Sequence, residues 1–544
     1  MSKIGHYLQQ HLSGEVITTA DARRYFSTDG SIFSVVPSAV IYPRNENDVR
    51  KTTRFTWQLA ERGRIVPLTA RGSGTDQSGG AIGSGLMMVF PAHMNRIVEF
   101  DGKTGVVTIE PGINYGKLQQ TLQTHGRFLP PFPASLEYST VGGAVANNAS
   151  GENSIKYGDT RSYVRSLRVV LANGEVIQTG RLAKKELNKK LGLSTFEGEI
   201  YRSLDALLEE NQDLIDRARL NVTKNTAGYE LLDIKHGDGS FDLTPLFVGS
   251  QGTLGVITEI TLNTEVHNPE TTLILATFDN LKHAEQTVLE LRKLSEIPSS
   301  IEMVDGRMLE LVDSLNPHQL KGIIEKPFPA IALLISFDNA ERAQKKLVKQ
   351  THKILQKHAL GYTLETELDK QETLWKVRHA SAAVSAHAEG GVKAVPIIED
   401  GVVPLERFNE YIDQIYRMFD RNHLRAAVWG HAGDANLHLQ PYLDLGQVGD
   451  RQKAFKLMDE YYNLVISLGG STSGEHNDGR LRAPYLPHVY GPEMYAVFQK
   501  VKQIFDPYGT INPGVKVNVE LADIKPLVRN EYSLNHLYDH LPRS

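Results

Sequence analysis

The chain has 544 residues, a formal net charge of −5 at pH 7 and no cysteine. Its length is sufficient for two or more domains, each with its own hydrophobic core. The weakly acidic balance provides no basic surface for nucleic acid, so we expect no nucleic-acid partner. The absence of cysteine excludes disulfides, cysteine-held iron–sulfur clusters and cysteinyl cofactor links.

The sequence carries no sign of export or of a membrane span. The first sixteen residues, MSKIGHYLQQHLSGEV, lack the apolar run of a secretion signal. The best apolar run, at 330–337, is far shorter than the roughly 20 residues that cross a bilayer. We therefore expect a cytoplasmic protein with no transmembrane segment, and we leave peripheral attachment to a membrane open.

Apolar spacing in the first half predicts a mixture of strands and helices. Residues 1–36 are expected to form a short helical leader. Strands are expected at 39–42, 65–68, 86–90, 97–100, 106–109 and 253–262, and helices at 47–62, 198–211 and 212–220.

A second region begins near Asn268 and alternates between the two kinds of element. Its expected strands are 272–278, 299–304, 331–337 and 363–367, and its expected helices are 281–293, 307–314 and 339–358. A β-α-β-β-α-β order predicts a sheet with helices on one face. The turn-rich FDPYGTINPGVK at 505–516 is expected to pack back onto the first domain. The predicted division is a leader (1–36), a first domain (37–267), a second domain (268–504) and a returning C-terminal segment (505–544).

A glycine-rich loop follows the strand predicted at 65–68. Its residues Arg71, Gly72, Ser73, Gly74 and Thr75 lack side-chain bulk, and successive backbone N–H groups in such a turn can bind a pyrophosphate. The loop matches neither G-x-x-x-x-G-K-[ST] nor a helix-opening G-x-G-x-x-G, so a plain tight turn remains an alternative. A second segment at 131–164 is rich in small and amide residues, and a loop of that length is usually functional.

Three motifs in order, RGSGT…SGG, PAS…TVGG..ANNASG…YGDTR and GSQGTLGVI, resemble the vanillyl-alcohol oxidase/p-cresol methylhydroxylase flavoproteins. The resemblance covers roughly 35–520 and implies an α+β fold: a two-subdomain FAD-binding domain plus an α+β, ferredoxin-like substrate or cap domain. The pyrophosphate is then expected on residues 72–76. Asp76 ends that loop; by matching position, the other FAD-lining residues are Ser135, Thr140, Gly143, Asn148, Gly151 and Ile257, with Asn512 near the cofactor. Covalent members carry a histidine in the glycine-rich loop, and its absence here implies non-covalent FAD.

A candidate metal site comes from VWGHAGDANLHLQP at 428–441 and GEHNDGRLR at 474–482. Glycines and a proline argue against a helix through His431 and His438, and a straight strand would place them on opposite faces. A turn at 433–434 between two short strands would bring both imidazoles together. With Glu475 they form an N,N,O ligand set suited to Zn²⁺ and compatible with Mn²⁺, Fe²⁺ or Co²⁺.

The segments HAGDANLH and SGEHNDGRLR resemble the C-terminal signatures of the FAD-linked D-2-hydroxyacid dehydrogenases, the D-lactate dehydrogenase-like group. The resemblance implies that His431, His438 and Glu475 hold the metal and that His476 is the base. Ala435 and Asn477 stand where the family usually has glycine, which puts the turn geometry and substrate preference in doubt.

Three further residues are candidates for substrate contact. Arg378, in LWKVR, is expected to grip the substrate carboxylate with its planar fork, and Lys393 is a second candidate cation. Asn436 is expected to orient a ligand or contact substrate. A solvated surface charge is the alternative for either cation.

These features predict oxidation of a D-2-hydroxy acid, D-lactate before others, with hydride passing to the flavin N5 and electrons leaving to a non-NAD acceptor. A quinone, a cytochrome, an electron-transfer flavoprotein or an iron–sulfur subunit would serve, and a homodimer is left open. The alternatives are D-2-hydroxyglutarate or glycolate as substrate, a catalytically idle flavin-binding subunit, and a metallohydrolase with an unrelated first domain.

Overall fold

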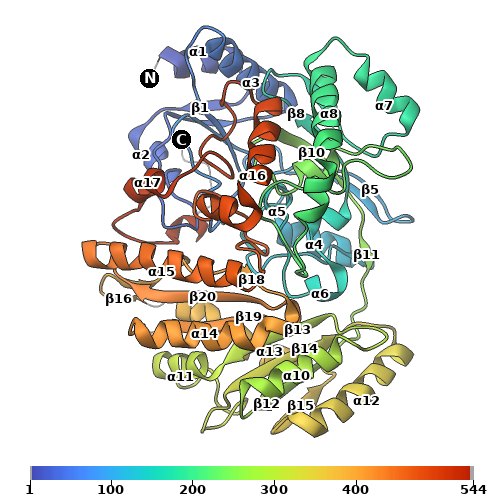
Figure 1. The fold of residues 1–544 in the computed structure, drawn as a ribbon, viewed down its shortest axis with the longest axis vertical. Helices are drawn as coiled ribbons and strands as arrows, with labels where there is room; N and C mark the ends of the chain where they lie inside the picture. The colour runs from blue at the N-terminus through green and yellow to red at the C-terminus, as the bar shows by residue number, and fades with distance from the viewer. Residues whose placement is uncertain (1–2, 387, 425, 539–544) are drawn as a thin grey trace.

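The computed structural model describes residues 3–538 except 387 and 425, and gives no account of the side chains of 381–389, 427 and 538. Figure 1 shows two lobes. The blue, green and red segments form the upper lobe, and the yellow-green to orange segments form the lower one. We call these the FAD-type lobe and the cap lobe.

The first sheet of the FAD-type lobe has four strands in the order β1-β2-β4-β3. They are β1 (Glu15–Ile17), β2 (Ala39–Tyr42), β3 (Leu68–Arg71) and β4 (Leu86–Val89). Strands β2, β3 and β4 are parallel and nearly fully buried, as expected for short apolar runs covered on both faces. The helices α1 (Lys3–His11), α2 (Ala20–Tyr25) and α3 (Glu46–Ala60) belong to this part of the lobe. The expected leader is therefore part of the lobe, because β1 pairs with β2.

The second sheet has the order β5-β6-β10-β8-β9. Its strands are β5 (Ile97–Asp101), β6 (Val106–Ile109), β8 (Val164–Val170), β9 (Val176–Gln178) and β10 (Val256–Leu262). The remaining elements of this part are α4 (Tyr115–Thr124), β7 (Arg127–Phe128), α5 (Val141–Asn147), α6 (Ser154–Tyr157), η1 (Thr160–Tyr163), α7 (Lys184–Leu191), α8 (Phe196–Arg217), α9 (Thr244–Phe247) and β11 (Glu265–Val266). Helix α8 covers both helices expected at 198–220, with a kink at Asn211.

The cap lobe is built on one long sheet in the order β15-β12-β14-β13-β19-β20-β17-β16, with β18 paired to β20. The first four strands are β12 (Thr272–Phe278), β13 (Ser300–Asp305), β14 (Ile331–Phe337) and β15 (Gly361–Glu365). Their order in the sheet is ferredoxin-like. The other strands are β16 (Ala388–Glu389), β17 (Val392–Ala394), β18 (Gly401–Val402), β19 (Ala426–His431) and β20 (Asn436–Leu443).

Helices cover both faces of the cap sheet. Ile274 and Ala276 of β12 face the core that contains α10 (Leu281–Leu291), α12 (Glu341–His358), α14 (Phe408–Arg421) and α15 (Val448–Ser467). Leu273 and Leu275, one residue out of phase, face α11 (Gly306–Leu315) and α13 (Leu368–Ala386). The expectation of helices on one face was wrong, because α11 and α13 pack on the other side of the same strands.

The C-terminal elements return to the FAD-type lobe. Helix α16 (Leu486–Phe505) packs Val497, Phe498 and Val501 into the core beneath the second sheet, although the sequence placed it in the cap domain. Ile511 then bridges to Leu68 beside β3. The short elements η2 (Leu405–Arg407), η3 (Ala432–Asp434), η4 (Ala483–Tyr485), α17 (Leu521–Ile524), η5 (Lys525–Leu527) and η6 (Asn535–Tyr538) complete the fold.

Candidate active site

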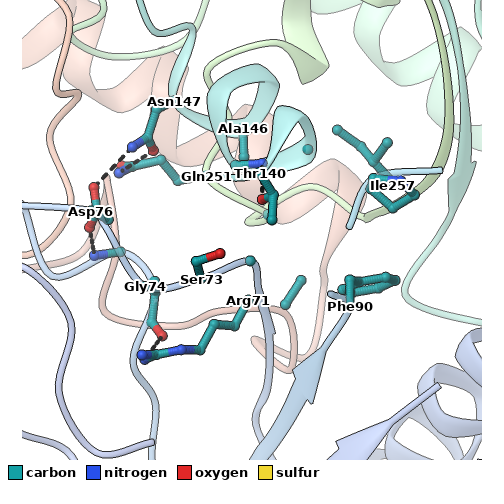
Figure 2. Close-up of a pocket in the computed structure, with 18 of the residues that line it drawn as sticks. Arg71, Ser73, Gly74, Asp76, Phe90, Thr140, Ala146, Asn147, Gln251 and Ile257 are labelled. Atoms are coloured by element: carbon teal, nitrogen blue, oxygen red, sulfur yellow. Dashed lines mark hydrogen bonds between the residues drawn. The ribbon is translucent and has the colours of Figure 1, made fainter. Parts of the chain in front are cut away.

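The glycine-rich loop after β3 forms one side of a pocket of about 780 Å³ of empty space. In Figure 2, Arg71 and Ser73 lie on one side of this pocket and Thr140 and Asn147 lie on the other. Asn147 donates from Nδ2 to Asp76 Oδ1 at 3.0 Å, so the two sides are joined at one end. Among the predicted residues, the pocket is lined by Arg71, Gly72, Ser73, Gly74, Thr75, Asp76, Thr140, Gly143 and Ile257.

The backbone of this pocket fits a phosphate-bearing group. A Cβ on Gly72 would lie 2.2 Å from Thr140 Oγ1, so only glycine allows the loop to approach helix α5 this closely. Gly74 has a φ of 78°, in the left-handed region. A pocket walled by small residues and backbone suits the pyrophosphate of a dinucleotide.

Two of the residues predicted to line FAD do not line this pocket. Asn148 ends helix α5 with a φ of 52° and donates from Nδ2 to Asp159 Oδ2. Asn512 donates from Nδ2 to the carbonyls of Gly80 and Gln251. Neither residue lines a described pocket, and both hold the loops that do.

A second cavity adjoins the first and reaches the cap lobe. The two share Thr75, Asp76, Gly143 and Asn147 as lining residues, and the second has about 1550 Å³ of empty space, open solvent included. The predicted residues Ser135, Gly151, Arg378, His431, His438, Glu475 and His476 also line it. The glycine-rich loop and the predicted metal residues therefore open into one cavity.

The hairpin of β19 and β20 positions the two histidines. Trp429 pairs with His438 and His431 pairs with Asn436, so the two histidines are diagonal neighbours on one face of the sheet. Their ring centroids are 5.2 Å apart. Gly430 allows this tight hairpin, because at its φ of 148° a Cβ would lie 2.5 Å from the carbonyl oxygen of Asn436.

Three imidazoles converge on one oxygen of Glu475. The Nε2 atoms of His431, His438 and His476 lie 2.9, 3.2 and 3.7 Å from its Oε1. The loop that carries Glu475 and His476 is held by Asp400, whose carboxylate accepts hydrogen bonds from both backbone N–H groups. His431, His438 and Glu475 form a cluster that could hold a metal ion, and their chemistry is the N,N,O set suited to Zn²⁺.

Two buried glutamates that the sequence analysis missed orient these histidines. Glu302 on β13 lies 2.6 Å from His431 Nδ1, and Glu399 lies 2.6 Å from His476 Nδ1. Each carboxylate accepts from Nδ1–H and so turns Nε2 towards the cluster, as is usual for metal-binding histidines. Neither glutamate belongs to a recognisable sequence motif. Glu302, for example, approaches His431 only because the sheet pairs β13 with β19.

Lys224 and Ser150 hold the other oxygen of Glu475 and were also missed. Lys224 Nζ and Ser150 Oγ each lie 2.8 Å from Oε2. Both residues come from the FAD-type lobe, so that lobe fixes how Glu475 presents Oε1 to the histidines. Ser150 stood inside the predicted cofactor segment, but nothing in its spacing pointed to a contact with Glu475.

The pKa values of His476 and Glu399 are set by two opposing effects, burial and the charges paired with them. Burial alone would lower the pKa of His476, but the carboxylates of Glu399 and Asp400 raise it to about 10. Burial would raise the pKa of Glu399, yet His476 and Arg482 hold it well below its ordinary value. Arg482 is fully buried and donates to Glu399 Oε1 at 2.6 Å.

The three residues predicted to contact substrate differ in their position relative to the second cavity. Arg378 lines the cavity, and its Nε donates to Glu302 Oε2 at 2.7 Å. Lys393 is not among the lining residues, and its Nζ donates to the carbonyl oxygen of Tyr532 at 2.7 Å. Asn436 is fully buried behind the cavity and donates from Nδ2 to the carbonyl of Gly401.

The two departures from the family pattern both have left-handed backbone. Ala435 has a φ of 51° and Asn477 a φ of 64°, so each occupies a conformation that favours glycine. Asn477 uses its side chain there: Nδ2 donates to the carbonyls of Asn147 and Gly249. The turns therefore keep the backbone that a glycine would adopt.

Comparison with known families agrees with this geometry. Residues 37–180 match the family described as FAD binding domain, and residues 267–515 match FAD linked oxidases, C-terminal domain. Among solved structures, p-cresol methylhydroxylase with substrate bound has a TM-score of 0.69 at 14% identity, covering 96% of this chain and 97% of that one. The fold is that of the vanillyl-alcohol oxidase/p-cresol methylhydroxylase flavoproteins. The chain carries both domains of the FAD linked oxidases, and its similarity to proteins named D-2-hydroxyglutarate dehydrogenase and D-lactate dehydrogenase extends over most of its length.

Curated relatives carry several substrate names. D-2-hydroxyglutarate dehydrogenase of Escherichia coli (strain K12) is 31% identical over 93% of this chain, and the chain spans about half of that protein's length (50%). Glycolate oxidase subunit GlcD of Bacillus subtilis (strain 168) is 29% identical, over 89% of both chains. D-lactate dehydrogenase of Archaeoglobus fulgidus is 28% identical over 92% of this chain and 96% of that one.

Proposed function

We propose that the protein oxidises a D-2-hydroxy monocarboxylic acid, D-lactate before others, to the 2-oxo acid. The observation that carries this proposal is the convergence of three imidazole Nε2 atoms on Glu475 Oε1 in a cavity that the glycine-rich loop also lines. When bound, non-covalent FAD would accept the electrons and a divalent metal, Zn²⁺ before Mn²⁺, Fe²⁺ or Co²⁺, would lower the pKa of the substrate hydroxyl.

The chain's own residues supply position and a proton acceptor. The Arg378 guanidinium is proposed to bind the substrate carboxylate, because it lines the cavity and its fork matches a carboxylate. His476 is proposed to take the hydroxyl proton at Nε2, because its Nδ1 lies 2.6 Å from a Glu399 carboxylate oxygen. A cation held by His431, His438 and Glu475 would oppose a positive charge on this ring and lower its pKa from about 10, which would leave Nε2 able to accept the proton. His431, His438 and Glu475 are proposed to hold the metal.

The cavity lining favours a monocarboxylate. Among its described residues Arg378 is the one arginine or lysine, while Asp76, Glu152, Glu399 and Glu475 are acidic. A second carboxylate would therefore meet negative charge without a partner, which is costly in a partly buried site. D-2-Hydroxyglutarate is the second candidate, because a relative 31% identical carries that substrate in its name. Glycolate is a third, on the GlcD relative.

Anaerobic mixing of the FAD-loaded protein with D-lactate, D-2-hydroxyglutarate and glycolate tests the proposal. D-Lactate is expected to bleach the flavin absorbance fastest. The variant His476→Asn should keep FAD and lose about 10²- to 10⁴-fold in the reduction rate, the usual contribution of a general base. Faster bleaching by D-2-hydroxyglutarate would contradict the monocarboxylate assignment. Undiminished reduction of His476→Asn would contradict the base.

Electrons must leave the reduced cofactor to a further acceptor. The chain contains no cysteine, so a quinone, a cytochrome, an electron-transfer flavoprotein or a separate iron–sulfur subunit is proposed for that role. The described part of the chain has no helix long and apolar enough to span a membrane. A cytoplasmic location, peripheral membrane attachment and a homodimer stay predictions.

A further inference from the structure

The chain continues past the segment that matches the C-terminal family domain, which ends at 515. Residues 528–537 of this continuation, here called the C-terminal tail, border the second cavity. Tyr532, Leu534 and Leu537 line that cavity together with the three converging histidines. The tail is therefore part of the cavity that the proposed substrate would enter.

The tail is fixed to the FAD-type lobe along its length. Arg529 donates to the carbonyl of Ser31 at 2.6 Å, and Tyr532 Oη donates to the carbonyl of Gly30 at 2.9 Å. Further along, His536 Nε2 lies 2.9 Å from the carbonyl oxygen of Gly74 in the glycine-rich loop. His536 and Tyr532 are each 8% exposed, so these contacts are buried.

The cap lobe holds the tail as well. Lys393 Nζ, on strand β17, donates to the carbonyl oxygen of Tyr532 at 2.7 Å, and the neighbouring Ala394 lines the cavity. Lys393 thus contacts the backbone at the residue where the tail enters the cavity. The tail spans both lobes and presents apolar side chains to the space between them.

We propose that the C-terminal tail is the wall against which the side chain of the 2-hydroxy acid packs, with Leu534 and Leu537 limiting its length. The inference rests on the proposed function for its substrate class. All 2-hydroxy acids share the carboxylate and the hydroxyl by which they would bind. The protein can therefore distinguish one from another only by the carbon chain. In an apolar pocket each added or missing methylene changes discrimination by about 10- to 200-fold. Lys393 is a positioning residue for this wall.

The test uses the FAD-loaded protein and a series of acids: D-lactate, D-2-hydroxybutyrate and D-2-hydroxyhexanoate. Leu534→Ala and Leu537→Ala are expected to raise kcat/KM for the six-carbon acid relative to D-lactate by about 10-fold each, because each substitution shortens a side chain of the wall. Leu537→Phe should shift the ranking in the opposite direction. Leu527→Ala, just before the tail and outside the cavity lining, is the matched control. Leu527→Ala should rank the acids as the natural protein does, and the same unchanged ranking in the Leu534 and Leu537 variants would overturn the proposal.

Equilibrium binding provides a second readout that needs no turnover. Dissociation constants for pyruvate and 2-oxohexanoate, measured by calorimetry, should shift in the same direction as the kinetic ranking. If no acid reduces the wild-type flavin but these constants still shift, the proposed oxidation fails and the wall stands. If the acids react and neither readout shifts, the wall fails alone.

Lys393→Met separates anchoring from substrate binding. If Lys393 anchors the tail, Lys393→Met should weaken the discrimination between acids by chain length, as the leucine variants do. Lys393→Arg should restore that discrimination. An equal loss for every acid, with the ranking unchanged, would instead make Lys393 a carboxylate contact and contradict its role in the wall.

Discussion

At the scale of single residues, Glu302 joins two groups of the site. One of its oxygens lies 2.6 Å from His431 Nδ1, and the other accepts from Arg378 Nε at 2.7 Å. Burial would raise the pKa of Glu302, but His431 and Arg378 lower it below its ordinary value. This carboxylate therefore stays ionised and orients both a proposed metal ligand and the proposed substrate clamp.

Replacing Glu302 by glutamine tests that role. Glu302→Gln keeps the size and removes the negative charge, so we expect metal affinity to fall by about 10- to 100-fold, as for other residues that orient metal-binding histidines. Competition with a chromophoric chelator measures the change. The exposed Glu296→Gln in the same lobe is the control. Unchanged affinity in Glu302→Gln would mean that the hairpin alone fixes His431.

At the scale of elements, the segment from Gly474 to Arg482 owes its conformation to side-chain contacts that a glycine could not make. Asn477 Oδ1 accepts from Lys516 Nζ, and Nδ2 donates to the carbonyls of Asn147 and Gly249. These bonds tie the loop that carries Glu475 to the FAD-type lobe.

Two substitutions at Asn477 separate backbone strain from hydrogen bonding. Asn477→Gly removes these buried bonds, and we expect a loss of about 2–3 kcal/mol in the free energy of unfolding, because each unpaired partner costs about 1–3 kcal/mol. Asn477→Ala should lose about 1 kcal/mol more, because its Cβ adds left-handed strain. Chemical denaturation measures both. A glycine variant more stable than the natural protein would show that strain outweighs the bonds.

The sequence was most informative for the regular elements of the cap lobe. Strands β12 and β14 lie at 272–278 and 331–337 as predicted, because near-continuous apolar runs bounded by helical patterns define both ends. The hairpin through His431 and His438 was also anticipated, because a turn at Gly433 and Asp434 between two short strands was expected to bring the rings together. The glutamates behind them were not, because Glu302 and Glu399 approach the histidines only through sheet pairing and loop packing. Residues of one local motif are visible in a sequence, whereas partners 77 to 129 positions away are not.

At the scale of the whole molecule, Ser150 links the two halves of the site. Its Oγ donates to Glu475 Oε2 at 2.8 Å, while the loop that carries it lines the cavity shared with the glycine-rich loop. FAD bound at the glycine-rich loop and a metal bound to Glu475 should therefore strengthen each other's binding. This coupling is reciprocal.

Metal affinity measured with and without FAD tests this coupling. We expect the flavin-loaded protein to bind Zn²⁺ about 5- to 150-fold more tightly, the usual range for coupled sites. Ser150→Ala should reduce that ratio, because one of the two groups holding Oε2 is lost. Thr75→Ser, on the glycine-rich loop but without a contact to Glu475, is the comparison. A ratio of one in the natural protein would show that the lobes bind their ligands independently.

The tail beside the cavity also affects how the molecule can be observed. Asn535 lies on its exposed side, between two residues that face inward. Since the chain has no thiol of its own, Asn535→Cys would accept a single fluorophore with no background labelling. A change in its emission when an acid is added would then report whether the tail moves as the cavity fills.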